Sequence, residues 1–412
     1  MHLHKDYSLI FDLYAQLFAN YNRLLNVYAQ YSQMRYLYQE IDWDDRLILI
    51  RGPKGSGKTT MLFQHIQRTF ADHTKAIYCS LDHIWFASHS LLELAEYAYT
   101  HAITHLFLDE IHRYNTWAIE LKNIYDSYPD LHIVATGSNA LDIIHQVADL
   151  SRRCMVYTMH GLSFREYLKM EGVADLPVIA LEDILSKHTQ LAIDITTTQN
   201  IKVLPHFERY RQKGFYPFYR DSNQNYWDRI SQVIDTIIYT EIPAVSKLEY
   251  DSVYKVKPLL AILAQQNPYT INIASLCQSL SISRNALVKL IDLLDKAGLI
   301  RRLYAETEEW NQFNKPEKIL FNNTNLMYAL SPNADTGTMR ETFFASMLAQ
   351  GHKLAMPHKG DFLIDKKYLF EVGGRSKGYK QIAGIENSFV VRDDVEFGLE
   401  NRIPLWMFGL LY

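Results

Sequence analysis

The chain has 412 residues, of which 48% are hydrophobic and 21% charged, and its formal net charge is −4 at pH 7. This length predicts about two or three domains, and the near-average globular composition allows each of them a substantial core. The small negative charge excludes a protein that binds nucleic acid through a global basic field, so any such contact needs a local patch.

The cellular compartment is predicted from three features. The cysteines, Cys79, Cys154 and Cys277, are far apart and have no metal-binding or redox spacing. The first residues do not have a signal-peptide layout, and no run approaches the ~18 apolar residues of a membrane span. Together these features predict a soluble cytoplasmic protein without membrane contact.

Residues 1–35 are predicted to form an amphipathic aromatic helix. Two apolar stripes lie side by side at spacings of three and four residues: Tyr7, Phe11, Tyr14, Phe18, Tyr21, Leu25 and Tyr28, and then Ile10, Leu13, Leu17, Leu24 and Val27. Because so broad an apolar face usually packs on a core, we favour a helix that covers the domain that follows it. The alternative is a helix that docks a partner or a second copy of the chain, which would make a homo-oligomer.

Residues 52–59 have the phosphate-binding loop pattern GxxxxGK[S/T], between an apolar run at 47–50 and helix-compatible residues. The predicted phosphate-binding residues are Gly52, Pro53, Lys54, Gly55, Ser56, Gly57, Lys58, Thr59 and Thr60. Glycines let successive backbone amides surround phosphate oxygens, and the N-terminus of the following helix favours the anion. Lys58 would reach the β- and γ-phosphates and Thr59 would bind Mg²⁺, so ATP and Mg²⁺ are the predicted ligands. No base-reading motif separates ATP from GTP.

A pair of acids, Asp109 and Glu110, ends the apolar segment at 105–108. In P-loop ATPases the first such acid holds Mg²⁺, and we predict this role for Asp109. Glu110 is predicted to be the general base that orients and deprotonates the attacking water. The alternative is an ordinary strand followed by a solvated turn.

Strands and helices alternate over residues 36–160, the predicted ATPase core. Buried parallel strands are expected at the short apolar segments 47–50, 76–81, 106–108, 133–136 and 154–157. This alternation predicts an α/β fold, a doubly wound parallel sheet with the phosphate loop at its carboxyl edge. Residues 161–250 are predicted to be a helical lid or linker.

Residues 251–310 are predicted to be a winged helix. Three helices and then a strand are expected at 258–263, 273–280, 284–296 and 301–304. On DNA or RNA, the third helix would present Ser283, Arg284, Asn285 and Lys289 to a groove. Since few of its residues are basic, a winged helix that packs only against protein is an equal alternative.

These motifs resemble those of bacterial and archaeal AAA+-like ATPases whose C-terminal domain is related to PD-(D/E)xK restriction-endonuclease folds. The match runs from about residue 36 to the end, and its further marks are Trp117 and the segments 121–126, 136–139, 162–168 and 318–323. The resemblance implies a polar sensor of the γ-phosphate at Ser138 or Asn139, with Thr136 less favoured. It also aligns Arg153 with an arginine that could act as an arginine finger, although Arg152 and Arg153 could equally solvate the sheet edge.

The resemblance further implies a nuclease-like domain over residues 311–412, with a possible second metal site at Glu341, Asp361 and Glu371. A three-residue turn at 365–367 would place Asp361 opposite Glu371, with Cβ atoms ~5 Å apart, whereas a two-residue turn would put them on opposite faces. The lysine of the family pattern is replaced by Gly373, so Arg375 or Lys377 would have to supply the cation. We favour a degenerate domain with a binding or structural role over an active nuclease.

Three functions are compatible with these features. The leading one is an ATPase that acts as an ATP-driven switch or machine on nucleic acid. The second is a signalling or assembly ATPase whose C-terminal parts bind protein, and the third is a nuclease gated by ATP.

Overall fold

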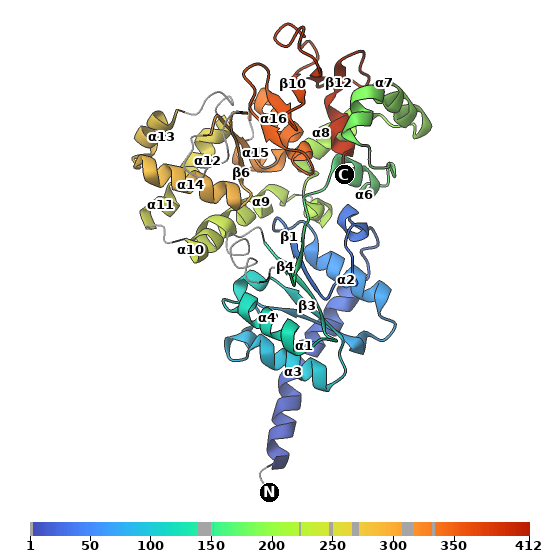
Figure 1. The fold of residues 1–412 in the computed structure, drawn as a ribbon, viewed down its shortest axis with the longest axis vertical. Coiled ribbons are helices and arrows are strands. Elements are labelled where there is room, and N and C mark those ends of the chain that lie inside the picture. Colours follow the sequence, from blue (N-terminus) through green and yellow to red (C-terminus); the bar gives the residue numbers. More distant parts are fainter. Residues whose placement is uncertain are drawn as a thin grey trace. The chain divides into compact units, whose positions relative to one another are not determined.

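The computed structural model describes residues 3–138, 150, 152–221, 224–246, 250–265, 272–306, 316–331 and 334–412, and of residues 3–13, 244–245 and 250–251 it describes the backbone. The chain forms two compact units, Met1–His160 and Gly161–Tyr412. Figure 1 shows both units in the colours of the sequence.

The first unit is built on a five-stranded sheet in the order β2-β3-β4-β1-β5. Every strand pair in this sheet is parallel. The strands are β1 (Leu47–Arg51), β2 (Ala76–Ser80), β3 (His105–Asp109), β4 (His132–Gly137) and β5 (Met155–Thr158). The five predicted strands and their parallel arrangement are therefore confirmed.

Helices cover both faces of this sheet. They are α2 (Lys58–Thr69), α3 (Leu91–Thr100) and α4 (Trp117–Ser127), with the short turns η1 (Tyr36–Gln39), η2 (His73–Lys75), η3 (Ile84–Ala87) and η4 (Ile111–Arg113). Leu47 and Leu49 of β1 share a core with α3 and α4, whereas Ile48 and Ile50 share a second core with α2. Because successive strand residues point to opposite faces, one strand serves both cores.

The N-terminal helix α1 (Leu3–Tyr28) packs along the first unit beside its edge strand β2. Tyr14 and Leu17 belong to the core under α3 and α4, and Tyr21 and Leu25 belong to the core under α2. Tyr14 also stacks on Tyr97, with ring centroids 3.8 Å apart. The part of the helix whose side chains are described therefore packs on the cores of the first unit, as we favoured. Four residues of the predicted apolar stripes lie outside the part of the helix whose side chains the structure describes: Tyr7, Ile10, Phe11 and Leu13.

Histidine rings pack together in the first unit where α2 meets the amino ends of β3 and β4; His65 is buried, and His105 and His132 are half-buried. His65 stacks on Trp43, with centroids 3.8 Å apart, and His105 stacks on His132 at 4.8 Å. Burial lowers the pKa of His65 to about 4, with a further contribution from His105. Burial also lowers the pKa of His105 to about 4, with a further contribution from His132. Both rings are therefore packed in their neutral form.

We expect the first unit to lose stability as the pH falls from 6.5 towards 4. The unfolded chain takes up protons at His65 and His105 near pH 6.5, whereas the folded unit does so only near pH 4. Each histidine then removes at most about 1.4 kcal/mol per pH unit in this window. Thermal unfolding of His65→Phe should show a smaller decrease on acidification, whereas the exposed His73→Phe should match the parent. An equal acid response of His65→Phe and the parent would contradict this expectation.

The second unit contains a mixed five-stranded sheet in the order β12-β11-β10-β9-β8. Its strands are β8 (Leu354–Ala355), β9 (Phe362–Ile364), β10 (Tyr368–Gly373), β11 (Ser388–Arg392) and β12 (Arg402–Pro404). Ile364 pairs with Tyr368 across the antiparallel β9–β10 hairpin, so the turn has three residues. Of the two turn lengths considered, the structure has the three-residue turn, and the strand pairing runs as far as Phe362 and Phe370, next to Asp361 and Glu371. Asp365 and Lys366 of the turn adopt positive φ.

Helices make up most of the second unit before this sheet. They are α6 (Phe164–Met170), α7 (Leu181–Thr198), α8 (Val203–Lys213), α9 (Tyr226–Thr236), α10 (Ile242–Val245), α11 (Tyr250–Tyr254), α15 (Thr324–Leu330) and α16 (Thr336–Leu348), with η6 (Pro217–Asp221), the π-turn η7 (Ile237–Glu241) and η8 (Leu405–Leu410). The two ends of the unit are tied together. Arg165 donates to the Tyr412 carbonyl (3.0 Å), and the Tyr412 hydroxyl donates to the Gly161 carbonyl (3.3 Å).

A three-helix group with a two-stranded antiparallel sheet lies between these helices in the sequence. It comprises α12 (Val256–Gln265), α13 (Ile273–Leu280), α14 (Arg284–Lys296), β6 (Ile300–Leu303) and β7 (Lys318–Phe321). The side chains of Asn272 and Ser283 cap α13 and α14. Arg302 of β6 is buried and pairs with Asp292 (2.7 Å) and Asp295 (2.9 Å), which fastens the strand to α14.

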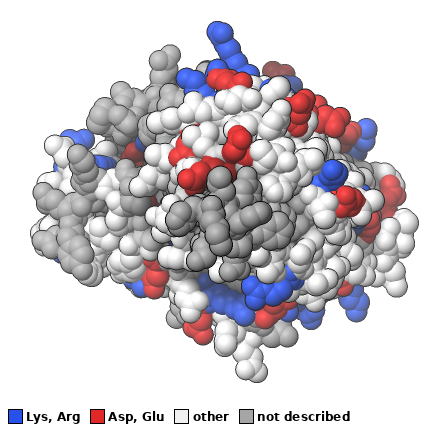
Figure 2. Space-filling view, turned by 90° about the horizontal axis from the view of Figure 1, so that it is seen from below, with Lys and Arg blue, Asp and Glu red and all other residues white. Residues whose placement is uncertain are grey.

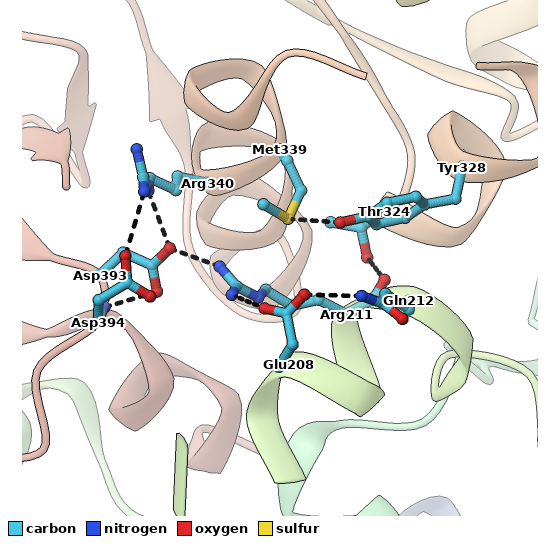
Figure 3. A network of polar contacts seen from close by, with 9 residues as sticks. All are labelled: Glu208, Arg211, Gln212, Thr324, Tyr328, Met339, Arg340, Asp393 and Asp394. Carbon is cyan, nitrogen blue, oxygen red and sulfur yellow. Dashed lines mark hydrogen bonds and ion pairs between the residues drawn. The ribbon is translucent and has the colours of Figure 1, made fainter. Parts of the chain in front are cut away.

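A polar network centred on Arg211 joins α8 to α16 and to the residues after β11 (Figure 3). The Arg211 guanidinium pairs with Asp393 (2.6 Å) and with Glu208, and Arg340 of α16 also donates to Asp393 (2.8 Å). Arg211 and Asp393 are 3% and 2% exposed. Burial acts to lower the pKa of Arg211, but the Asp393 and Glu208 carboxylates outweigh it and raise that pKa. The cation is therefore held charged inside the unit.

The surface carries charges of both signs. On the face drawn in Figure 2, Lys and Arg side chains and Asp and Glu side chains are spread among uncharged residues. This agrees with the small net charge of the chain. Within the described residues, every helix is too short or too polar to cross a bilayer.

Candidate active site

The phosphate loop between β1 and α2 requires glycine at three positions. Gly55 and Gly57 have φ of 83° and 96°, in the left-handed region that L side chains rarely adopt. At Gly52, an added Cβ would lie 2.1 Å from the carbonyl oxygen of Met159. The loop pattern therefore reflects both backbone conformation and close packing.

Lys58 is buried at the first turn of α2 and points its ammonium into the loop. Its Nζ donates to the carbonyl oxygens of Gly52 (2.8 Å) and Pro53 (3.0 Å). The Ser56 hydroxyl is buried and, among the described residues, has no hydrogen-bond partner. An ammonium, an orphaned hydroxyl and a helix N-terminus at one loop suit a phosphate anion. Pro53, Lys54, Gly55, Gly57, Thr59 and Thr60 are all partly or fully exposed.

Asp109 is the centre of the hydrogen bonding at the carboxyl edge of the sheet. It is 3% exposed. Its Oδ2 accepts from the hydroxyls of Thr59 (2.6 Å) and Tyr78 (2.9 Å), and its Oδ1 accepts from the hydroxyl of Thr136. Donors from α2, β2 and β4 thus converge on one carboxylate of β3 and hold it in one orientation.

The predicted magnesium ligands lie next to each other. The Thr59 hydroxyl and the Asp109 carboxylate are 2.6 Å apart, and both offer oxygen, the donor atom that Mg²⁺ prefers. These residues therefore fit the ion that the sequence predicts.

Glu110 stands directly after β3 in a strained conformation. Its φ and ψ are 53° and 41°, a left-handed conformation that costs an ordinary residue about 1–2 kcal/mol. Its side chain is 27% exposed, and its carboxylate lies 3.4 Å from Nε2 of His112. Burial raises the pKa of Glu110; Lys58 opposes this rise and Asp109 reinforces it. Strain of this kind is common at functional positions.

The predicted sensor residues are only partly described. Ser138 is 3% exposed, and its amide donates to Nδ1 of His112 (3.4 Å). Asn139 lies outside the described residues. Thr136, the candidate we favoured less, is the one whose hydroxyl contacts Asp109.

Arg153 forms an ion pair at the amino edge of the sheet, opposite the carboxyl edge that carries the phosphate loop. It precedes β5, whereas the phosphate loop follows β1, and parallel strands place these two points at opposite edges. Its Nε and Nη2 atoms donate to the Asp126 carboxylate at 2.8 and 3.0 Å. Arg153 is therefore not part of the site of its own chain, and a role as an arginine finger in a second copy stays a prediction.

Sequence reasoning missed three residues of the site. Tyr78 reaches Asp109 from the neighbouring strand. Arg35 is buried and donates to the carbonyls of Ser56 in the loop and of His160 (2.9 Å) at the end of the unit. His112 contacts both Glu110 and Ser138. Tyr78 and Arg35 stand far from the loop in sequence and carry no local signal, but the position of His112 two residues after the acid pair could have drawn attention.

The three acids of the second unit lie close together, but lysines share their site. Lys318 of β7 pairs with Glu341 (2.7 Å), and Lys377 pairs with Glu371 (2.5 Å). Asp361 Oδ2 accepts from the amide of Val372 (2.8 Å). Burial raises the pKa of Glu341 to about 7, against the opposing effect of Lys318.

The side chain of Lys377 packs against Gly373, the position at which the resemblance implies a lysine. A Cβ added to Gly373 would lie 2.6–2.8 Å from side-chain carbons of Lys377. The prediction that Lys377 reaches this site agrees with the structure. In the described part of the chain, however, no group of three His, Cys, Asp or Glu residues is arranged to hold a metal ion. Lys318 and Lys377 pair with two of the three predicted ligands, Glu341 and Glu371, and the metal site at Glu341, Asp361 and Glu371 stays a prediction.

We expect this acid–lysine cluster to support the fold and not to cleave DNA. Lys377→Met leaves the buried Glu371 carboxylate without its cation and should lower the free energy of unfolding by about 1–3 kcal/mol. The exposed Lys380→Met is the control and should change it by less than about 0.5 kcal/mol. Supercoiled plasmid incubated with Mg²⁺ or Mn²⁺ should stay intact. Nicking that disappears in Asp361→Ala would contradict this expectation.

The fold and the geometry of the first unit are those of a P-loop nucleotide-binding domain. The phosphate loop follows β1, which lies between β4 and β5, and an acid pair ends β3 of the same parallel sheet. The family model described as an AAA domain matches residues 44–168. A second model, a domain of unknown function (DUF8612), matches residues 204–337. It assigns no activity, so the winged helix and the nuclease-like domain stay predictions.

The chain is 28% identical over 366 residues to the uncharacterized protein MJ1637 of Methanocaldococcus jannaschii, a match that covers 82% of this chain and 77% of the relative. It is similar to the Walker-type ATPase PABY2304 of Pyrococcus abyssi (TM-score 0.40, 12% identity, 71% of this chain and 93% of that one). It is also similar to AMPPCP-bound DnaA from Aquifex aeolicus (TM-score 0.25, 14% identity, 67% and 88%).

Proposed function

We propose that the protein is a Mg²⁺-dependent ATPase that hydrolyses ATP and uses the cycle to act on nucleic acid. The observation that carries the ATPase proposal is the convergence of Thr59, Tyr78 and Thr136 on the Asp109 carboxylate beside the phosphate loop. Such convergence holds a carboxylate in one orientation at the place where a triphosphate and its cation would lie.

In this proposal, each residue has one task. Amides of the loop and the Lys58 ammonium bind the phosphate oxygens, and Glu110 accepts a proton from the attacking water. Thr59 and Asp109 would hold Mg²⁺, which neutralises charge that develops on the phosphates. Thr136 orients Asp109. Arg153 would act only in the site of a second copy, because it lies at the far edge of its own sheet.

The nucleic-acid part of the proposal rests on α14. Its N-terminal residues Ser283, Arg284 and Asn285 are exposed, as is Lys289 one turn later. The opposite face is buried, through Leu287, Leu290 and Ile291. A helix held by one face, with polar residues at its exposed start, has the form of a recognition helix.

We expect DNA or RNA to change the rate of ATP hydrolysis and to bind in a salt-sensitive way. Removing two phosphate contacts with Arg284→Ala and Lys289→Ala together should weaken binding and reduce the salt slope by about 2. Lys202→Ala, an exposed lysine of α8's N-terminal cap, is the control. ATPase rates measured with DNA, with RNA and without polymer give the second readout. Equal rates in all three, together with an oligomer size that depends on ATP, would support a protein-assembly ATPase instead.

A further inference from the structure

The imidazole of His112 lies between two parts of the candidate active site. His112 belongs to η4, directly after Glu110, and its side chain is 5% exposed. Its Nδ1 lies 3.4 Å from the amide nitrogen of Ser138, at the end of β4. Its Nε2 lies 3.4 Å from Oε2 of Glu110. One ring therefore spans the acid after β3 and the residue that follows β4.

The partners of the ring decide which nitrogen carries the proton. A backbone amide can only donate, so Nδ1 must accept from Ser138 and be the bare nitrogen of a neutral ring. The proton of the neutral ring then sits on Nε2, the nitrogen that lies 3.4 Å from the Glu110 carboxylate, close enough for an electrostatic contact but without hydrogen-bond geometry. The two contacts are longer than the usual ~2.9–3.0 Å, so each adds little stability. The two contacts act on orientation: the contact with Ser138 holds the imidazole ring, and the ring in turn orients the Glu110 carboxylate.

Glu110 needs such support because its side chain is 27% exposed and its backbone has a strained, left-handed conformation. A general base must stay within hydrogen-bond reach of the water that it deprotonates. The same ring also contacts the end of β4, the strand whose Thr136 donates to Asp109. A displacement of Ser138 would therefore move the ring and, with it, the carboxylate.

We propose that His112 is a positioning residue that orients the Glu110 carboxylate and couples it to the sensor end of β4. This proposal rests on the proposed ATPase function. His112 itself need not touch ATP, and it acts through Glu110 alone.

The test compares variants of the full chain that differ in the two contacts. His112→Leu removes both contacts and should lower kcat by at least roughly 10-fold, with KM for ATP changed by less than about twofold. His112→Asn keeps an acceptor for Ser138 but is too short to reach Glu110, so it should be as slow as His112→Leu. The side chain of His112→Gln can accept from Ser138 and donate to Glu110, and this variant should recover most of the rate. His132→Leu, at the amino end of β4, is the control and should keep the parental kcat.

Two further readouts separate positioning from general stability. In a Glu110→Gln background, His112→Leu should cause no additional loss, because the group that it positions is gone. Nitrogen NMR of the full chain should find the proton of His112 on Nε2. Equal rates for His112→Asn and His112→Gln, an additive loss in the Glu110→Gln background, or a proton on Nδ1 would each overturn the proposal. Parental hydrolysis by Glu110→Gln would instead refute the proposed function, so the two failures are distinguishable.

Discussion

Replacing Glu110 with glutamine is expected to lower kcat for ATP hydrolysis by about 10²–10⁴-fold while ATP still binds. The amide has nearly the shape of the carboxylate but cannot accept the proton of the attacking water. Glu110 stands beyond Asp109, outside the group of hydroxyls that orients that acid, so the substitution should leave the binding pocket intact. Steady-state turnover and the thermal shift with Mg·ATP measure the two effects separately.

Lys58→Ala is the matched comparison for this experiment. It removes the ammonium that lies in the loop near the Gly52 and Pro53 carbonyls, so the thermal shift with Mg·ATP should shrink together with the rate. Lys122, which is exposed on α4 and lies outside the site, supplies a control as Lys122→Ala. Unchanged turnover in Glu110→Gln would refute the role of general base. A parental thermal shift in Lys58→Ala would contradict the phosphate-binding role of the loop.

Replacing Arg211 with methionine is expected to destabilise the second unit by about 3–5 kcal/mol, because it leaves buried carboxylate charge without its main partner. Asp393 is 2% exposed and would keep only Arg340 beside it. Glu208, on the same helix, would also lose its cation. Methionine fills much of the space of the arginine stem, so the loss reports mainly on charge. Denaturant unfolding, followed through the transition that Mg·ATP does not shift, measures this difference.

Lys213→Met is the control for Arg211, since Lys213 is exposed on the same helix α8 and should contribute less than about 0.5 kcal/mol. The double variant with Asp393→Asn removes cation and anion together. It should lose less stability than the two single variants added, because neither charge is then left alone. A loss for Arg211→Met as small as that of the Lys213 control would show that this network does not hold the unit together.

Local patterns predicted the secondary structure well. The helices expected at 273–280 and 284–296 coincide with α13 and α14, because apolar periodicity marks their buried faces and Asn272 and Ser283 cap their starts. At the turn after Ile364 the sequence left two lengths open, and the strand pairing of the structure has three residues there. Such local patterns do not predict contacts between residues that are distant in sequence. Lys318 is an example, because it meets Glu341 only through the packing of β7 near α16.

The sequence by itself determined the phosphate loop, the acid pair after β3 and the five parallel strands that carry them, because each of these is written in contiguous residues with a local physical reason. Only the tertiary structure decided that Tyr78 and Thr136 orient Asp109, that His112 bridges Glu110 and Ser138, and that Lys377 fills the space beside Gly373. These contacts join residues on different strands, helices and loops. Their geometry follows from how the elements pack, which no short stretch of sequence specifies.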